Sequence, residues 1–186
     1  MKTIAFVNFK GGAGKTTAAL LFARALMESN VDVAIDDRDP NQVAATTAPR
    51  LGLKVGTAAA YVIIDTAGYI HDPKLADVIK TADLVVIVLG PTPTDLMVTR
   101  GTADYIRQQR APQAKTVVLF TRVQGNRFSR ILESFAEPLQ FPALKNVLGH
   151  RTNYVASQID GWDALTKSEK HEVISVALEI ITLAIS

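Results

Sequence analysis

The sequence predicts an α/β fold with a doubly wound, mostly parallel sheet that carries helices on both of its faces. Short runs of apolar residues alternate with segments of helical composition along the chain. Because these runs are apolar at successive positions, they are typical of strands that are covered on both sides. A glycine-rich loop and several carboxylates follow the runs at their carboxyl ends, which is where ligands bind in such sheets.

The first half of the chain contains a strand, a glycine loop, a helix and two further strands. Lys2–Asn8 is an apolar run of strand type, and the glycine loop follows it. Ala, Leu and Met dominate Thr16–Glu28, so we expect a helix that ends near Ser29-Asn30. Val31–Asp36 is a second short apolar run, and Tyr61–Ile64 is a third.

The second half continues the alternation. We expect helices from about Asp72 to Thr81 and over Asp95–Gln109, and strands over Leu84–Leu89 and Thr116–Phe120. Asn126 is a candidate cap for a helix that runs through Leu139, and Ala143–Leu148 is ambiguous. Thr166 and Glu169 have the spacing of a capping box, so a last helix is expected to follow them.

Composition limits the class of protein. The 186 residues fit one compact domain, 1–186, and 48% hydrophobic with 20% charged residues is typical of a soluble globular protein. The absence of Cys excludes disulfides, thiolate metal sites and cysteine-ligated iron–sulfur clusters, so a cytoplasmic location is expected. A formal net charge of +2 permits a polyanionic partner but does not require one.

Residues 6–20, FVNFKGGAGKTTAAL, contain a phosphate-binding loop with one departure from the usual pattern. Gly14, Lys15 and Thr16 fit G-x-x-x-x-G-K-[ST], but Phe9 stands where the first glycine belongs. Lys15 is expected to reach the β- and γ-phosphates of a nucleotide, and Thr16 to ligate Mg²⁺. The expected nucleotide-binding residues are Gly11, Gly12, Ala13, Gly14, Lys15, Thr16, Thr17 and Arg122.

Asp65 ends the apolar run YVIID, and a carboxylate at such a strand end typically holds Mg²⁺ through water. Gly68 follows in DTAG, where the backbone can approach a γ-phosphate. Guanine-binding proteins usually carry an [NT]-K-x-D pattern after a later strand, but residues 121–124, TRVQ, contain no Asp. We therefore expect ATP and Mg²⁺ as the cofactors.

At this point the residues resemble a known family. KGGAGKTT is similar to the deviant Walker A motif K-G-G-x-G-K-[ST]-T of the ParA/MinD family of ATPases, in which the first glycine of the usual loop is routinely absent. The resemblance implies a P-loop NTPase fold of the SIMIBI type. It also implies that Lys10 is a signature lysine that reaches across a nucleotide-sandwich dimer to the ATP of the partner, like an arginine finger.

The segment DRDP, residues 37–40, resembles the D-x-D-P-Q element of the same family. The resemblance implies that Asp39 positions or activates the attacking water and that Asp37 supports the Mg²⁺ shell. Asp36 adds a third carboxylate, for which Arg38 is a local donor. The expected catalytic residues are thus Lys10, Lys15 and Asp39, and the expected metal site comprises Thr16, Asp37 and Asp65.

DLVVIVLGPTPTDL and HRTNYVASQIDGWDAL resemble later segments of the family, and the short chain is similar to small plasmid partition ATPases of the ParF kind. The resemblance implies an ATP-dependent homodimer that binds DNA without sequence preference and is nucleoid-associated when ATP-bound. It implies slow hydrolysis that a ParB-like or cargo adaptor protein stimulates. Candidate DNA-binding residues are Arg127, Arg130, Lys145, Arg151, Lys167 and Lys170.

Two alternatives remain open from the sequence. One is a MinD-like ATPase that acts at a membrane surface, and the other is a small metabolic P-loop enzyme. The tail carries no Lys or Arg after Lys170 and is apolar around most of the helix, which favours a packed core helix over a basic amphipathic anchor. No membrane partner is therefore expected.

Overall fold

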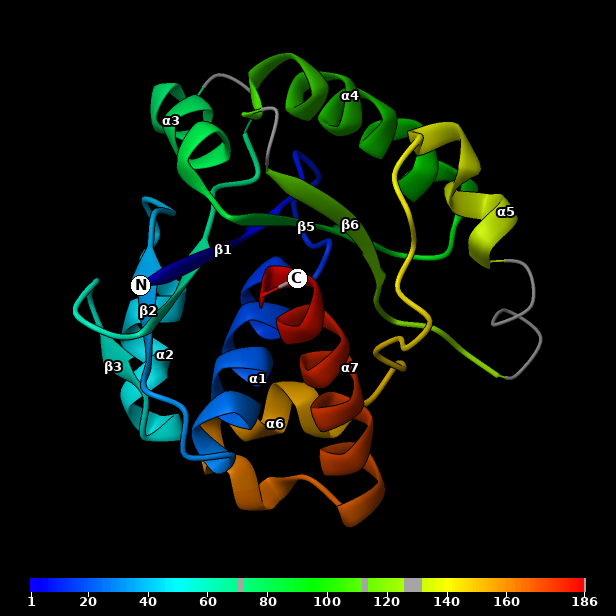
Figure 1. Ribbon diagram of the computed structural model, residues 1–186. Coiled ribbons are helices and arrows are strands. Elements are labelled where there is room, and N and C mark those ends of the chain that lie inside the picture. The colour runs from blue at the N-terminus through cyan, green and yellow to red at the C-terminus, as the bar shows by residue number, and fades with distance from the viewer. Residues whose placement is uncertain (70–71, 112–113, 126–131, 186) are drawn as a thin grey trace.

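The chain folds around a six-stranded, all-parallel sheet with the strand order β3-β2-β4-β1-β5-β6 (Figure 1). The computed structural model describes residues 1–69, 72–111, 114–125 and 132–185. The strands are β1 (Lys2–Val7), β2 (Val33–Asp37), β3 (Lys54–Val55), β4 (Tyr61–Asp65), β5 (Leu84–Leu89) and β6 (Lys115–Phe120). The predicted α/β fold with a parallel sheet is confirmed.

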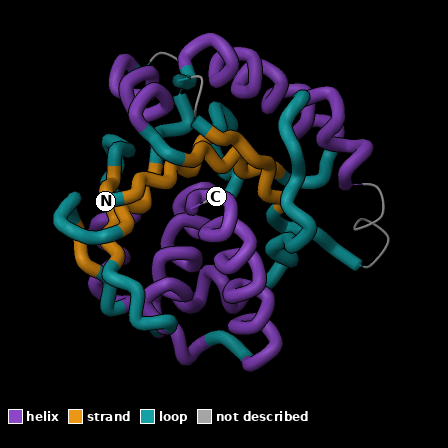
Figure 2. Tube along the Cα trace, viewed as in Figure 1, coloured by secondary structure: helices purple, strands orange, loops and turns teal. Residues whose placement is uncertain are grey.

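Helices cover both faces of the sheet, and Figure 2 shows the strands lying between two helical layers. The helices are α1 (Lys15–Glu28), α2 (Val43–Thr47), α3 (Pro73–Thr81), α4 (Pro93–Gln109), α5 (Leu132–Ala136), α6 (Thr152–Asp160) and α7 (Lys167–Ile185). Three short 3₁₀ turns are described, η1 (Ala48–Leu51), η3 (Glu137–Leu139) and η4 (Trp162–Ala164). One layer contains α1, α6 and α7, and the other contains α3, α4 and α5.

Alternate residues of each central strand enter different cores, which explains the continuous apolar runs in the sequence. On β1, Ile4 and Phe6 pack into the core beneath α1 and α7, whereas Ala5 and Val7 pack into the core beneath α3 and α4. All six residues of β5 are buried. Because both faces are covered, neither face of these strands retains the polar alternation of a half-exposed sheet.

Side chains cap the helices at positions that the sequence partly predicted. Asp72 accepts a hydrogen bond from the backbone N–H of Lys74 at the start of α3 (2.9 Å). The capping box before α7 is confirmed, because the Thr166 N–H donates to Glu169 Oε2 (2.8 Å) and the Glu169 N–H donates to Thr166 Oγ1 (3.3 Å). Among the described helices, none has the length and hydrophobicity to cross a membrane.

The ambiguous segment Ala143–Leu148 forms neither a helix nor a named strand. It runs along the outer edge of β6, where the N–H groups of Leu144 and Leu148 donate to the carbonyls of Val118 and Phe120 (both 2.9 Å). The segment therefore occupies hydrogen-bonding groups at the edge of the sheet.

Several elements were not predicted. The sequence analysis did not predict α2, β3 or α6, because these elements are short or lack a continuous apolar face. Of α6, only Tyr154 and Ser157 are buried. The helix expected from Asn126 to Leu139 is described only as α5 and η3, and its predicted cap, Asn126, lies outside the described residues.

Candidate functional site

A cavity of about 990 Å³ opens at the carboxyl edge of the sheet. The glycine loop forms one wall, and the loops that follow β2, β4 and β6 form others, together with the segment that enters α6. The lining residues are 11–18, 39–41, 67–69, 72, 121–122, 148–151 and 154–155. The structure thus brings most of the sequence-predicted site residues to one cavity.

The glycine loop has a backbone that requires glycine. Gly12 and Gly14 have φ values of 73° and 95°, in the left-handed region. A Cβ atom on Gly14 would lie 3.3 Å from Thr121 Oγ1, a hydroxyl that donates to the carbonyl of Ala13 (3.0 Å). No side chain caps the N-terminus of α1, so its first N–H groups face the cavity as donors for an anion.

Lys15 lies buried at the phosphate side of the cavity. Burial lowers the pKa of its ammonium group, whereas the charges of Asp65 and Asp39 raise it. Gly68 passes close to this cation, since a Cβ at Gly68 would lie 3.2 Å from Lys15 Nζ. An anionic phosphate would compensate a cation that is held out of water in this way.

Asp65 and Thr16 form the second part of the phosphate side. The Thr16 hydroxyl donates to Asp65 Oδ2 (2.7 Å), and Asp65 is fully buried. Within the described part of the chain, Asp65 Oδ1 has no hydrogen-bond partner. Burial is the main cause that raises the pKa of Asp65 to about 6. A desolvated carboxylate with an unpaired oxygen beside a hydroxyl is chemically suited to a hydrated divalent cation.

These residues fit Mg²⁺ better than a metal that needs an all-protein cage. In residues 1–69, 72–111, 114–125 and 132–185, no three His, Cys, Asp or Glu side chains converge to hold a metal. Mg²⁺ takes only one or two carboxylates and completes its shell with water and phosphate oxygens. Asp65 with Thr16 meets that requirement.

The two carboxylates of the DRDP turn have different surroundings. Asp37 accepts hydrogen bonds from the backbone N–H groups of Asp39 (2.9 Å) and Ala45 (2.8 Å), so its carboxylate anchors the turn. Asp39 lines the cavity and accepts from the Asn41 N–H (2.8 Å). Arg38 pairs with Asp36 (2.6 Å), as the local-donor argument predicted. The roles of Asp39 in water activation and of Asp37 in the Mg²⁺ shell remain predictions.

Lys10 does not line the cavity. Its ammonium group pairs with Asp95, a nearly buried residue in the first turn of α4. Asp95 also pairs with Arg122 (3.2 Å), which does line the cavity and has the unusual φ of 58°. One buried carboxylate therefore holds two cations, one from the glycine loop and one from the end of β6.

Phe9 is a packing residue, which explains the bulky side chain at the position of the usual glycine. Its ring meets the edge of Tyr105 on α4, with 5.4 Å between ring centroids. Its backbone N–H donates to Thr102 Oγ1 (3.1 Å). The start of the loop is thereby attached to α4.

The sequence analysis missed part of the cavity wall. Leu148, Gly149, His150, Tyr154 and Val155 line the cavity from the segment that enters α6 and from α6 itself. These residues carry no phosphate motif, and their contacts come from a distant helix. Only the family-like segment HRTNYVASQIDGWDAL pointed to this region.

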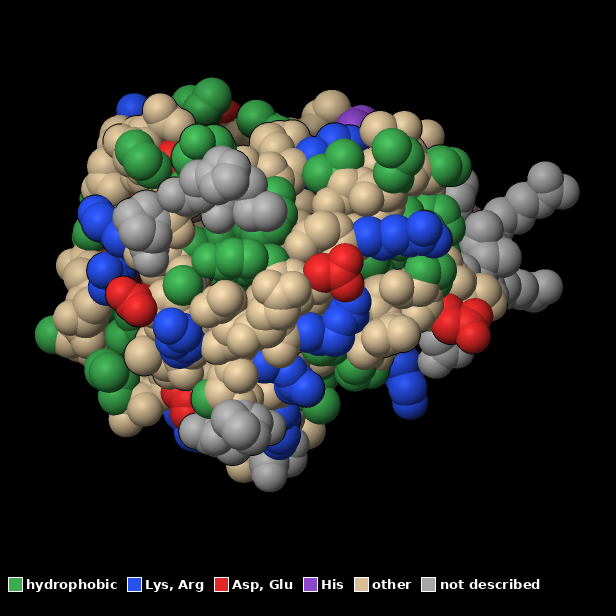
Figure 3. Space-filling model, turned by 90° about the horizontal axis from the view of Figure 1, so that it is seen from above, with side chains coloured by type: hydrophobic (Ala, Val, Ile, Leu, Met, Phe, Trp, Pro, Cys, Tyr) green, Lys and Arg blue, Asp and Glu red, His purple; other side chains and the backbone are tan. Residues whose placement is uncertain are grey.

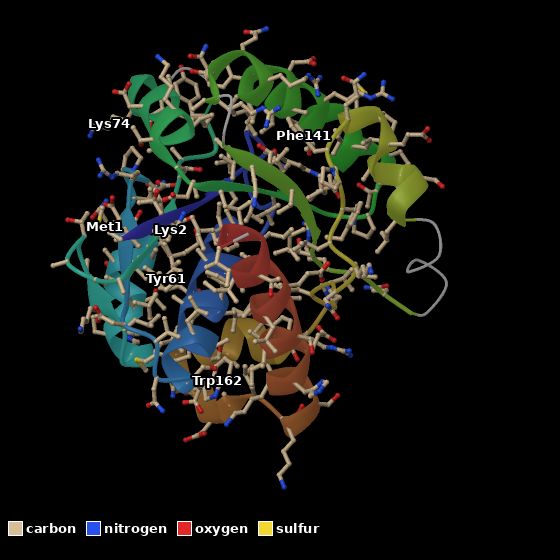
Figure 4. All side chains as sticks on the ribbon, viewed as in Figure 1. Met1, Lys2, Tyr61, Lys74, Phe141 and Trp162 are labelled. Atoms are coloured by element: carbon tan, nitrogen blue, oxygen red, sulfur yellow. The ribbon has the colours of Figure 1, made fainter. Side chains whose placement is uncertain are left out.

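The predicted DNA-binding residues have varied surroundings. Arg127 and Arg130 lie outside the described residues. Lys145 and Lys167 are exposed, and Arg151 lines the cavity. Lys170 pairs with Asp163 (2.7 Å) and lies over the ring of Trp162, which is labelled in the lower part of the molecule in Figure 4. Binding of DNA by these residues remains a prediction.

Comparison with known proteins identifies a nucleotide-binding family. Residues 4–161 match the model of the CobQ/CobB/MinD/ParA nucleotide binding domain family. The chain is 30% identical over 151 residues to a maintenance of carboxysome distribution protein A from Gloeobacter kilaueensis, covering 72% of this chain and 68% of that protein.

Solved structures share the fold at lower identity. One is a plasmid partition protein from Borrelia burgdorferi B31 bound to AMPPNP, with a TM-score of 0.71 and 16% identity over 97% of this chain and 98% of that one. Another is pNOB8 ParA bound to nonspecific DNA, with a TM-score of 0.74 and 16% identity over 98% of each chain.

Proposed function

The chain belongs to the CobQ/CobB/MinD/ParA nucleotide-binding family, and from that premise we propose that it is a ParA-type ATPase. In this proposal, ATP binding produces a dimer that binds DNA without sequence preference and positions a plasmid, a chromosome or a protein cargo. Hydrolysis is slow, and a ParB-like or adaptor partner stimulates it to release the dimer from DNA. The observation that carries the proposal is the phosphate end of the cavity, with a second lysine held just outside it.

The residues of the phosphate end have distinct proposed tasks. The N–H groups of the glycine loop and the buried Lys15 bind the phosphates, which they orient by charge-assisted hydrogen bonds. Thr16 and Asp65 would hold Mg²⁺, which would neutralise charge on the phosphate oxygens. Asp39, on the cavity wall, orients the attacking water.

Lys10 supports the dimer in this proposal. Its side chain is partly exposed, pairs with Asp95 and does not line its own cavity, so in this proposal it serves a second subunit. We propose that Lys10 exchanges Asp95 for the phosphate of the partner's ATP when two subunits meet. Arg122 remains as a cation for Asp95, so the exchange leaves no buried carboxylate alone.

Non-specific DNA binding is proposed from family and charge. The pNOB8 ParA of similar fold was solved with nonspecific DNA. Viewed from above, the face that α3 and α4 cover carries more Lys and Arg than Asp and Glu (Figure 3). The exposed cations of α3 and α4 include Lys74, Lys80 and Arg100. Dimerisation places two such faces on one duplex, which increases affinity through avidity.

A DNA gel shift with ATP, with ADP and without nucleotide tests the proposal. We expect a shift with ATP and Mg²⁺ alone, and no shift for Lys15→Ala under any condition. With on the order of four phosphates contacted, the log–log salt slope should be about −3.6. Equal DNA binding in all three nucleotide states would contradict the switch.

Two outcomes would favour the alternatives. ATP-dependent sedimentation with liposomes, without a DNA shift, would indicate a MinD-like function at membranes. A chain that stays monomeric with ATP, and whose hydrolysis rises with a small metabolite, would indicate a metabolic enzyme. The packing of α7 argues against the first, because Val173, Val176, Ala177, Ile180 and Ala184 of that helix are buried in the core.

A further inference from the structure

The cavity has two parts of different chemistry, and the wall formed by the segment that enters α6 suits a nucleoside. Lys15 and Thr16 line the phosphate end of the cavity, and Asp65 lies behind Thr16 and accepts a hydrogen bond from its hydroxyl. On the wall formed by the segment that enters α6, Leu148, Tyr154 and Val155 present apolar or aromatic surface. A purine ring needs apolar contacts on its faces and a few polar groups at its edge. We call residues 148–155 the base wall.

One carboxylate holds the base wall in place. Glu172, on α7, accepts hydrogen bonds through Oε1 from the Gly149 N–H (2.6 Å) and from the Tyr154 hydroxyl (2.5 Å). Its Oε2 accepts from Arg151 Nη2 (3.0 Å). All three donors belong to residues that line the cavity, whereas Glu172 itself does not line it.

The packing around this carboxylate is close. A Cβ atom on Gly149 would lie 2.9 Å from Arg151 Nε and 3.1 Å from Glu172 Oε1. The Glu172 side chain is 23% exposed, and its hydrogen bonds to Gly149 and Tyr154 are partly buried. Burial and the hydrogen bond to Glu172 raise the pKa of Tyr154, which keeps its hydroxyl protonated as a donor.

The same helix provides a matched comparison. Glu179, two turns further along α7, accepts from the backbone N–H groups of Lys145 (2.7 Å) and Asn146 (2.9 Å). These residues do not line the cavity. Glu172 and Glu179 therefore both attach the segment before α6 to α7, but only Glu172 contacts residues that line the cavity.

From these contacts we infer that Glu172 is a positioning residue for the nucleoside part of the nucleotide. It orders the base wall before ligand binds, so binding loses less conformational entropy. The inference rests on the proposed use of ATP by this cavity. It assigns a share of the affinity for the base to α7, although no residue of α7, which the structure describes in full, lines the cavity.

The test separates the two ends by comparing ATP with inorganic tripolyphosphate, each with Mg²⁺, as competitors against a fluorescent ATP analogue. Glu172→Ala should weaken ATP about tenfold, because the base wall loses its anchor, and tripolyphosphate less than about twofold. Glu179→Ala should change both by less than about twofold at a similar loss of thermal stability. Glu172→Gln keeps an Oε1 acceptor, so it should recover most of the ATP affinity.

The outcomes distinguish this inference from the proposed function. If Glu172→Ala binds ATP as the unsubstituted protein does, or weakens both competitors equally, the inference is wrong while ATP binding stands. An equal loss of ATP affinity in Glu179→Ala would also contradict it. If the unsubstituted protein binds tripolyphosphate as tightly as ATP, there is no base recognition and the inference fails. A protein that binds no ATP would overturn the proposed function and the inference together.

Discussion

The two ends of the cavity are built in different ways. At the phosphate end, the loop and the first turn of α1 supply donors that are neighbours in the sequence, and the strand ends of β2 and β4 add carboxylates. At the base wall, Gly149, Arg151 and Tyr154 donate hydrogen bonds to Glu172, which belongs to α7. At the first end, backbone N–H groups are available for a phosphate, whereas at the second a side-chain carboxylate holds the wall.

The contrast shows which kind of binding site can be predicted from a sequence. A loop that binds an anion through its backbone needs glycines at fixed spacing, so a short sequence motif marks it. A wall that is held by a distant carboxylate needs only an acceptor at the right place in space. Many residues and helices can supply such an acceptor, so no short motif marks it.

The largest expected effect comes from breaking the phosphate end. Lys15→Ala should weaken ATP roughly a thousandfold, since it removes several charge-assisted hydrogen bonds to phosphate. The fold should persist, because the change removes a buried cation whose pKa is already lowered by burial. Calorimetric titration with Mg²⁺–ATP measures the effect. Near-normal affinity would show that the phosphates bind elsewhere.

Lys10→Ala tests the proposed contact of Lys10 with the ATP of a second subunit. ATP affinity should stay within about threefold, whereas partner-stimulated hydrolysis should fall at least about a hundredfold, as with loss of an arginine finger. Light scattering with ATP and a phosphate-release assay measure dimerisation and hydrolysis. The control is Lys54→Ala, which removes an exposed lysine that pairs with Asp32. Normal hydrolysis and dimerisation in Lys10→Ala would exclude the cross-subunit role.

Asp65→Asn separates the effect of this carboxylate on metal binding from its effect on the stability of the fold. The raised pKa of about 6, against an ordinary 3.8, means that the folded state holds the proton more tightly than the unfolded chain. This contribution to metal-free stability is full below about pH 3.8 and is lost as the pH rises through about 6. At pH 7 the substitution should therefore stabilise the metal-free protein by roughly 1–3 kcal/mol.

With Mg²⁺ the same substitution should act in the opposite direction. Affinity for Mg²⁺–ATP should fall about 10–100-fold, because a ligand-orienting carboxylate is lost. Thermal unfolding between pH 4 and pH 8, with and without Mg²⁺–ATP, measures both effects. A destabilised metal-free protein at pH 7 would contradict the burial argument.

The smallest expected effect is at the base wall. Gly149→Ala should destabilise the fold by about 1 kcal/mol and weaken ATP a few-fold, because the added methyl group displaces Arg151 and Glu172. Gly101→Ala is the control, since its Cβ meets nothing within 4 Å and lies in α4, where alanine stabilises a helix by about 0.5–1 kcal/mol. Urea unfolding and ATP titration measure both. Equal outcomes for the two variants would remove the packing argument.

Particular elements show how far the sequence could predict this molecule. The central strands and α1, α3, α4 and α7 were predicted because buried apolar runs and caps such as Thr166 with Glu169 are local signals. The pairing of Lys10 with Asp95 was not predicted, because the two residues meet only when α4 packs beside the glycine loop. Tyr154 was missed as a cavity residue because it reaches the cavity only through the tertiary packing of α6.

The edges of the sheet limit how copies of this chain can assemble. On one side, β3 is two exposed residues long and includes Lys54; on the other, the backbone of residues 142–148 already occupies donors and acceptors of β6. Short, charged or covered edges resist the addition of a strand from another chain. Any filament that grows beyond a pair of subunits must therefore grow through contacts between side-chain surfaces, and dilution or salt should dissolve it more readily than a cross-β aggregate.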